Sequence, residues 1–277
     1  MLIGALRQLI VLGSLVLMFP ACAKIPYRYG PAEEQASVLQ PAADEKQITC
    51  GEPYTVIDFI GRYQPFALLS KLILWNWSIE NHEITPETEQ ALADYCTKNH
   101  LNVVKVRLNE YSPGGEFRRL LDNSNVGAGW RYTIGMLSVF FYTVLPGRIF
   151  GGDNYNPYTN TISLYSDHRA VALHEGGHAK YFASLKYKGT SAFLYMLPLA
   201  SLYFEAEATG DAIGYAKAEC DAGLEERSYK VLYPAYGTYL GGGLVEMTSF
   251  WSNINELLML AAVIPGHAVG RIKAAHV

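Results

Sequence analysis

The chain has 277 residues, of which 50% are hydrophobic, with a formal net charge of −4 and a pI near 6.0. A chain of this length can bury one sizeable core. The charge balance provides no basic field and no block of like charges, so we expect no nucleic-acid partner.

The first 23 residues are typical of a secretory signal. Arg7 precedes an apolar stretch from Leu9 to Phe19, and small residues surround Cys22. We therefore predict a signal peptide or lipoprotein signal over 1–23, and a protein exported to the periplasm or cell envelope of a bacterium. Cleavage after Ala23, lipid attachment at Cys22 and an uncleaved anchor helix all remain open, since Pro20-Ala21-Cys22 only loosely resembles a lipobox.

Residues 24–49 are rich in Pro, Ala, Glu and Gln, which predicts an exposed linker before a single domain over 50–277. Apart from Cys22, three cysteines remain. We expect Cys50 and Cys96 to form a disulfide in an oxidising compartment, leaving Cys220 unpaired.

An α/β pairing is predicted early in this domain. Thr85 is placed to cap a helix that has Pro86 in its first turn and runs through Cys96. The stretch Leu101–Leu108 after it alternates like a strand.

Four apolar segments can be either core helices or membrane-embedded helices: 132–150, 191–204, 231–250 and 257–269. Each is shorter than, or barely reaches, the roughly 20 residues of a spanning helix, and Pro or Gly interrupts most of them, so we favour core helices. The last two are the best candidates for a membrane hairpin, where the glycines from Gly237 to Gly243 would permit close helix contact.

The run His174-Glu175-Gly176-Gly177-His178 predicts a metal site. On a helix beginning near His168 and capped by Asp167, His174 and His178 are about 400° apart and share a face. Glu175 stands where a carboxylate takes a proton from a metal-bound water, as in the H-E-x-x-H pattern of zinc hydrolases. Two adjacent glycines inside a helix each cost roughly 1 kcal/mol, which indicates close packing of another backbone against the site.

A third ligand is expected from the downstream acidic segment. Glu207 is preferred over Glu205 because Asp211, one turn later, can accept the N–H of a ligating histidine. The histidines that could substitute are His168, His267 and His276.

Two histidines and one carboxylate leave an open fourth position, which is typical of catalytic zinc. The expected cofactor is therefore Zn²⁺, with Glu175 as the general base. A second electrophile should help, and spacing does not choose among its candidates Tyr215, Tyr233, Tyr236, Tyr239 and His267.

Residues Thr161–Tyr165 alternate like a short strand just before the zinc helix. We expect an edge strand to which an extended peptide could pair, with an internal strand as the alternative. The predicted fold class is α+β, a helix-rich domain with a small sheet.

At this point the chain resembles a gluzincin metallopeptidase. Residues 154–216 are similar to the HtpX and CAAX-prenyl endopeptidase group in three parts: the strand Thr161–Tyr165, the zinc helix and the second helix from Glu207 to Ala216. The resemblance implies a zincin-like fold, Glu207 as third ligand and Asp211 as its helper. Apolar segments between and after the zinc helices also resemble that group, in keeping with membrane association through the N-terminus and apolar helices.

The function expected from these features is a zinc-dependent endopeptidase of the bacterial envelope that acts on protein or peptide substrates. Two alternatives stay open: a non-catalytic zinc-binding envelope lipoprotein, and a zinc amidase acting on a non-peptide amide. Glu175 favours an enzyme, because zinc binding alone does not require it.

Overall fold

A computed structural model describes residues 23–31, 45–144, 147–150, 152–249 and 262–277. The predicted signal up to Cys22, residues 32–44 of the linker, and residues 250–261, where the two segments of the candidate membrane hairpin would be joined, lie outside these residues. Contacts divide the chain into two compact units, one of Met1–Tyr27 with Leu197–Val277 and one of Arg28–Met196. The predicted boundaries at residues 23 and 49 stay predictions. Within the described residues, no helix combines the length and apolarity needed to cross a membrane.

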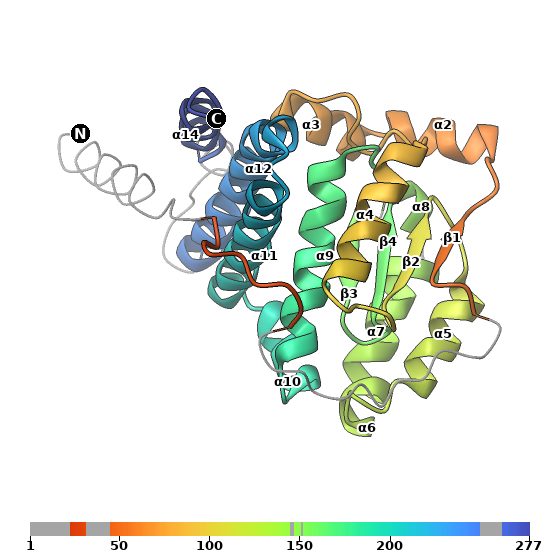
Figure 1. Ribbon diagram of the computed structural model, residues 1–277. Coiled ribbons are helices and arrows are strands. Elements are labelled where there is room, and N and C mark those ends of the chain that lie inside the picture. Colours follow the sequence, from red (N-terminus) through yellow and green to blue (C-terminus); the bar gives the residue numbers. More distant parts are fainter. Residues whose placement is uncertain (1–22, 32–44, 145–146, 151, 250–261) are drawn as a thin grey trace. The chain divides into compact units, whose positions relative to one another are not determined.

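The unit 28–196 contains a small mixed sheet among many helices, so the coarse α+β prediction is confirmed (Figure 1). Strands β1, β2 and β4 are parallel and β3 is antiparallel to β4, in the order β1-β2-β4-β3. The strands are β1 (Ile48–Cys50), β2 (Lys105–Leu108), β3 (Asn154–Asn156) and β4 (Thr161–Leu164).

The expectation of an edge strand over 161–165 is wrong. β4 lies inside the sheet, between β2 and β3, and β3 forms the edge. The turn between Asn156 and Thr161 folds β3 back onto β4, and Asn156 stabilises it by accepting a hydrogen bond from Tyr158 N at 3.0 Å. The alternative of an internal strand is the correct one, because β3, which the sequence analysis does not predict, covers the edge of β4.

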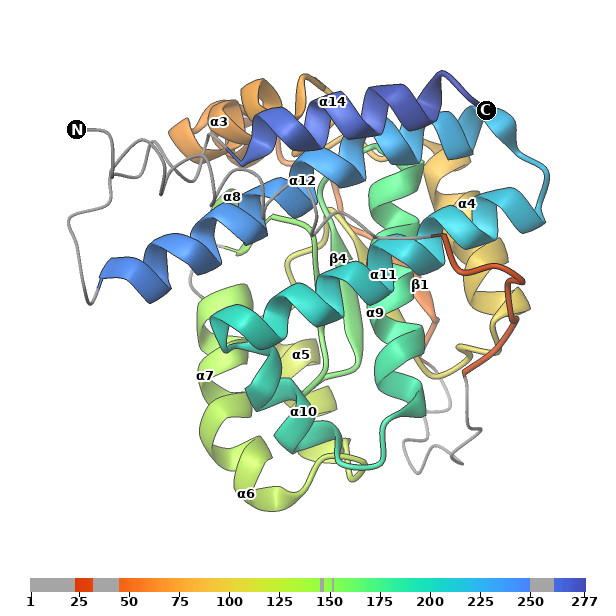
Figure 2. The ribbon, with the colours of Figure 1, turned by 90° about the vertical axis from the view of Figure 1, so that its left-hand side faces the viewer.

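The helices of this unit follow the chain around the sheet (Figures 1 and 2). They are α2 (Thr55–Tyr63), α3 (Pro65–Leu74), α4 (Pro86–Lys98), α5 (Pro113–Asp122), α6 (Ala128–Trp130), η1 (Arg131–Gly135), α7 (Met136–Val139), η2 (Phe140–Val144), α8 (Gly147–Phe150), α9 (Arg169–Ser184) and α10 (Lys188–Tyr195), where η marks a π-helix.

The predicted start of α4 is confirmed, with Thr85 at the N-cap and Pro86 in the first turn. The role expected of Asp167 is wrong. His168 is the N-cap of α9, and Asp167 instead accepts hydrogen bonds from the hydroxyls of Thr85 and Thr88 at 2.8 and 2.6 Å. Asp167 thus fixes the N-terminus of α4 beside that of α9.

The predicted strand over 101–108 is shorter and does not alternate. β2 lies between β1 and β4, and all four of its residues are buried, so neither face of the strand is exposed. Its Arg107 is accommodated by an ion pair in which Nε donates to Glu116 Oε1 at 2.7 Å. In the sequence, such a polar residue looks like an outward-facing position of a half-exposed strand, although it is buried and paired.

Helix α9 packs against α4 and against strands β3 and β4. A Cβ atom on Gly176 would lie 2.6 Å from Cε1 of Tyr95, a fully buried residue of α4. Close packing is therefore confirmed for Gly176, but the contact is a side chain of α4 and not another backbone.

The other unit contains α11 (Pro198–Ala218), α12 (Ala222–Ser249) and α14 (Val263–Ala274). Its core is built from tyrosines and aliphatic residues of these helices, among them Ile213, Tyr233 and Leu240. Glycines allow α12 and α14 to approach closely, since a Cβ on Gly266 would lie 2.7 Å from Tyr233 O. The prediction of a core helix is confirmed for the described part of 231–250.

For 132–150 the prediction of a core helix is wrong. The segment forms η1, α7, η2 and α8, and many of its large apolar side chains face solvent. Those at least 44% exposed are Tyr132, Leu137, Phe140, Phe141, Tyr142, Val144 and Phe150.

The expected disulfide between Cys50 and Cys96 is also wrong, since both are free thiols. Cys96 is buried within α4, where burial raises its pKa to about 12. Cys50 is exposed at the end of β1, and its thiol donates to the Glu89 carboxylate at 3.6 Å.

Candidate metal centre

The two histidines of the motif converge as their spacing predicts. His174 and His178 lie on α9, one turn apart, with their Nε2 atoms 3.1 Å from each other and their rings nearly perpendicular. Both side chains are buried, and His178 is only 2% exposed.

This pair fits two ligands of a tetrahedral zinc ion. With Zn–N bonds of about 2.0–2.1 Å and a tetrahedral angle, two ligand nitrogens lie about 3.3 Å apart. The observed Nε2 separation is 3.1 Å. The histidines alone therefore supply two correctly spaced donors without any rearrangement of α9.

Glu175 is buried on the same helix, directly after the first histidine. Burial raises the pKa of the Tyr142 phenol on η2, and the negative charge of Glu175 raises it further. A carboxylate held out of bulk water beside two imidazoles suits proton transfer.

Tyr195, at the end of α10, was missed by the sequence analysis. Its hydroxyl lies 3.4 Å from Nε2 of His178, and the two rings are 5.3 Å apart. The candidates for a second electrophile had been sought downstream of Glu207, so neither Tyr195 nor Tyr142 was considered. A chain with 20 tyrosines gives no spacing signal that could have identified them.

The predicted third ligand and its helper lie on α11, in the other unit. Glu207 Oε2 forms an ion pair with Lys24 Nζ at 2.8 Å, and its side chain is 27% exposed. Asp211 accepts a hydrogen bond from the Tyr27 hydroxyl at 3.1 Å. Within this unit, both residues therefore bind the segment that follows the predicted signal.

Glu205, two residues before Glu207, points to another side of α11. Its side chain is only 1% exposed. Burial of the Tyr236 phenol on α12 raises the pKa of that group, and the charge of Glu205 raises it further. The role of third ligand predicted for Glu207, and that of helper predicted for Asp211, stay predictions.

The substitute ligands are distributed over three elements. His168 caps α9, His267 is buried on α14, and His276 is exposed with its Nδ1 2.7 Å from Ile272 O. Among the candidate electrophiles, Tyr233 and Tyr236 belong to the core of their unit, while Tyr239 is 43% exposed. Tyr215 is buried and packs edge-on against Tyr27.

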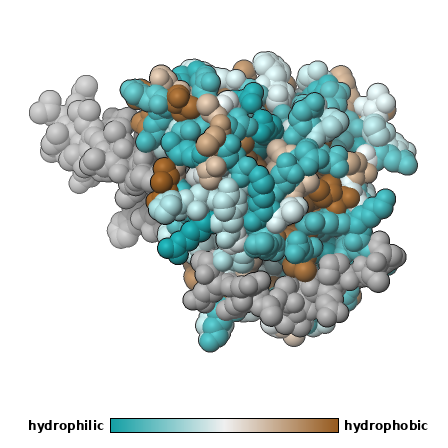
Figure 3. Space-filling model, viewed as in Figure 1, coloured by the Kyte–Doolittle hydropathy of each residue, from teal (hydrophilic) through white to brown (hydrophobic). Residues whose placement is uncertain are grey.

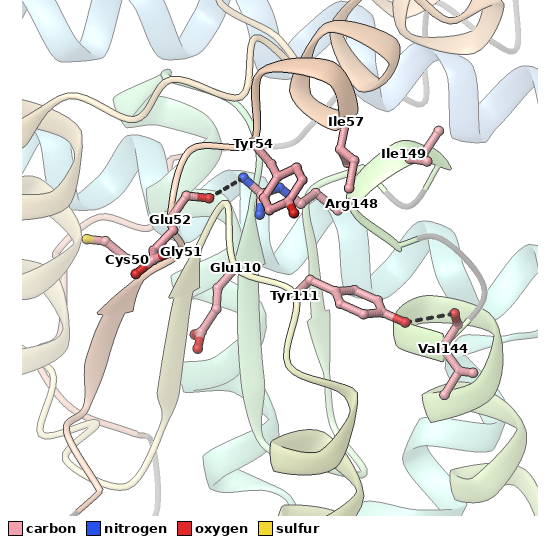
Figure 4. Close-up of a pocket in the computed structure, with 10 residues that line it drawn as sticks. All are labelled: Cys50, Gly51, Glu52, Tyr54, Ile57, Glu110, Tyr111, Val144, Arg148 and Ile149. Atoms are coloured by element: carbon pink, nitrogen blue, oxygen red, sulfur yellow. Dashed lines mark hydrogen bonds between the residues drawn. The ribbon is translucent and has the colours of Figure 1, made fainter.

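A separate cavity of about 520 Å³ lies beyond the carboxyl ends of β1 and β2, where parallel sheets commonly bind ligands (Figure 4). Two of its charged groups are engaged: Arg148 donates to Asp58, and Glu110 accepts from Arg107 at 2.9 Å. The lining residues are Cys50, Gly51, Glu52, Tyr54, Ile57, Glu110, Tyr111, Val144, Arg148 and Ile149. None of the candidate zinc residues lines this cavity.

Comparison with known proteins identifies no match among family models, curated proteins or solved structures.

Proposed function

We propose that the chain is a zinc-dependent peptidase in which His174 and His178 bind the metal and Glu175 is the general base. The observation that carries the proposal is the pair of Nε2 atoms 3.1 Å apart on α9, next to a buried carboxylate. A structural zinc site would use the histidines but has no need of Glu175. The same residue favours an enzyme over a zinc-binding lipoprotein.

For the third ligand we propose Glu205 rather than Glu207. Within its own unit Glu205 is the more buried of the two acids, at 1% exposure against 27% for the Glu207 side chain. The Glu207 carboxylate already forms an ion pair with Lys24 Nζ at 2.8 Å, which makes it the weaker candidate for a metal ligand. The proposal thus departs from the sequence-based expectation by two residues, slightly more than half a turn of α11.

The residues of α9 and α10 have distinct tasks in this proposal. Zinc, when bound, would polarise a water molecule and the substrate carbonyl. Glu175 takes the proton from that water and delivers it to the leaving amine. Tyr195 places a hydroxyl at the edge of the site, where it can donate to the developing oxyanion.

The biological setting belongs to the same proposal. An exported enzyme of the envelope would meet protein or peptide substrates, and hydrolysis of a non-peptide amide would use the same groups. A panel of peptide and cell-wall amide substrates separates these two reactions, because they share chemistry but differ in leaving amine.

The first test is metal content. We expect the purified chain to hold one zinc, and His174→Ala or His178→Ala to lose it. His276→Ala is the matched control, because His276 is exposed at the end of the chain and should leave zinc content unchanged. Full zinc content in both motif variants would remove the basis of the proposal.

The same measurement distinguishes the two acidic candidates. Glu205→Gln should weaken zinc affinity by orders of magnitude, while Glu207→Gln should change it little. The opposite result would assign the third position to Glu207 and leave the roles of the two histidines intact.

A further inference from the structure

The helical hairpin α2–α3 and the residues after it have an inverted polarity. Segment 54–77 contains three charged residues, Asp58, Arg62 and Lys71, and all three are held against the protein. Its large apolar side chains instead face outward, which is the reverse of a solvated surface helix.

Each charge has defined partners. Asp58 accepts two hydrogen bonds from Arg148 at 2.8 and 3.0 Å. Arg62 donates to Asn81 O and forms an ion pair with Glu83, and Lys71, only 2% exposed, donates to Arg62 O and Glu80 O.

The outward residues form the surface that we call the hairpin face. It combines aromatic and aliphatic side chains, six of which are more than 60% exposed. The hairpin face consists of Val56, Phe59, Ile60, Tyr63, Phe66, Leu69, Leu72, Trp75 and Trp77.

Neighbouring elements continue this apolar surface. Helix α8 packs against both α2 and η2, and Phe150 of α8 and Phe141 of η2 are 57% and 61% exposed. The face shown in Figure 3, by contrast, is mostly hydrophilic with separate hydrophobic patches. Contiguous apolar surface of this kind marks a site of protein or membrane contact.

We infer that the hairpin face lies in the interface of a lipid bilayer. Two tryptophans and a tyrosine at the surface are the residues preferred at membrane interfaces, and α2 and α3 are too short to span. The predicted signal or anchor over 1–23 would hold the chain at a membrane, and its linker leads directly into β1 and α2. A monotopic association thus fits both the surface and the expected attachment.

The charge pattern indicates what drives this association. The three charged side chains of 54–77, one anion and two cations, already bind protein groups, so neither cation is left to attract anionic headgroups. Burial of apolar side chains supplies the driving force, and insertion should depend weakly on lipid charge and on salt.

The experiment measures contact of the hairpin tryptophans with lipid chains. The chain has four tryptophans, Trp75, Trp77, Trp130 and Trp251, and none lies in residues 1–23. Replacing Trp130 and Trp251 by Phe leaves fluorescence from the hairpin face alone. In vesicles of neutral phosphatidylcholine with brominated acyl chains, we expect this full-length variant to be quenched to the same extent at low and high salt.

Charge placed on the hairpin face should abolish the quenching. We expect Phe59→Glu, Phe66→Glu and Leu72→Glu together to remove it, even where the N-terminus still holds the chain on the vesicles. The matched control carries Tyr187→Glu, Ile264→Glu and Ile272→Glu, at residues 68%, 70% and 61% exposed, and should remain quenched.

Absence of quenching in the tryptophan variant itself would overturn the inference and point to a protein partner, whether or not the glutamate variant folds. Quenching that appears only with anionic lipid and disappears at high salt would overturn it as well. Neither outcome bears on zinc content.

Discussion

Glu175 is the residue of α9 whose contribution is chemical rather than coordinative. Glu175→Gln keeps size and polarity but cannot accept the proton, so we expect zinc content to stay at one per chain. Hydrolysis should fall by about 10²–10⁴-fold. The measurement compares zinc content and peptide cleavage of wild type and variant, with a chelator as control.

Equal, chelator-insensitive cleavage by both proteins would show that the activity comes from elsewhere. If wild type cleaves nothing in a broad peptide library, the binding lipoprotein becomes the better description. Both outcomes are independent of which acid of α11 is the third ligand.

At the scale of elements, Gly176 determines how closely α9 approaches α4. Alanine is intrinsically better in a helix by about 1 kcal/mol, but its Cβ would overlap the buried Tyr95 ring. Overpacking of this kind costs about 1–3 kcal/mol, so we expect Gly176→Ala to lower the free energy of unfolding. Urea denaturation measures it.

Gly114→Ala is the control, because nothing lies within 4 Å of a Cβ at that position of α5. It should be neutral or slightly stabilising. If Gly176→Ala behaves like Gly114→Ala, the contact between α4 and α9 is looser than the structure has it.

The pairing of α2 with α8 gives a pH-dependent stability. Burial alone would raise the pKa of Asp58, but hydrogen bonds from Arg148, Tyr54 and Asn109 together hold it below its ordinary value of 3.8. A carboxyl whose pKa is lowered by folding stabilises the protein above its unfolded pKa, and this stability is lost as the pH falls through the folded pKa.

Asp58→Asn should therefore destabilise the chain most at neutral pH, by about 3–5 kcal/mol, because Arg148 is buried and loses its counter-charge. The difference from wild type should shrink below about pH 4. Thermal unfolding from pH 7 to pH 3 tests this, with Asp94→Asn on the exposed face of α4 as control. A difference that stays constant with pH would contradict it.

At the scale of the molecule, the sequence pattern predicts those features that depend on neighbouring residues, such as helix starts and the residues that share a helical face. The start of α4 and the convergence of His174 and His178 both follow from helical geometry and capping. Such features depend on residues within one or two turns of each other.

Features that depend on partners far along the chain were not predictable in this way. Asp167, predicted to cap the helix that follows it, instead accepts hydrogen bonds from Thr85 and Thr88 at the start of α4. Likewise, β4 pairs with β3, a strand that the sequence does not predict. The sequence predicts burial for the apolar segment 132–150, which is largely exposed. It gives no prediction of an apolar surface for segment 54–77. An apolar residue is not always buried. In α2 and α3 the three charged side chains contact the protein, and many of the large apolar side chains face solvent.

The outer strands of the sheet, β1 and β3, each have three residues. So short an edge is a poor template for adding a strand from another molecule. When concentrated copies of this protein associate, they should therefore do so through helical surface, giving clusters that mild detergent disperses. Amyloid dyes should not stain them, and their infrared spectra should keep the amide signature of the native helices.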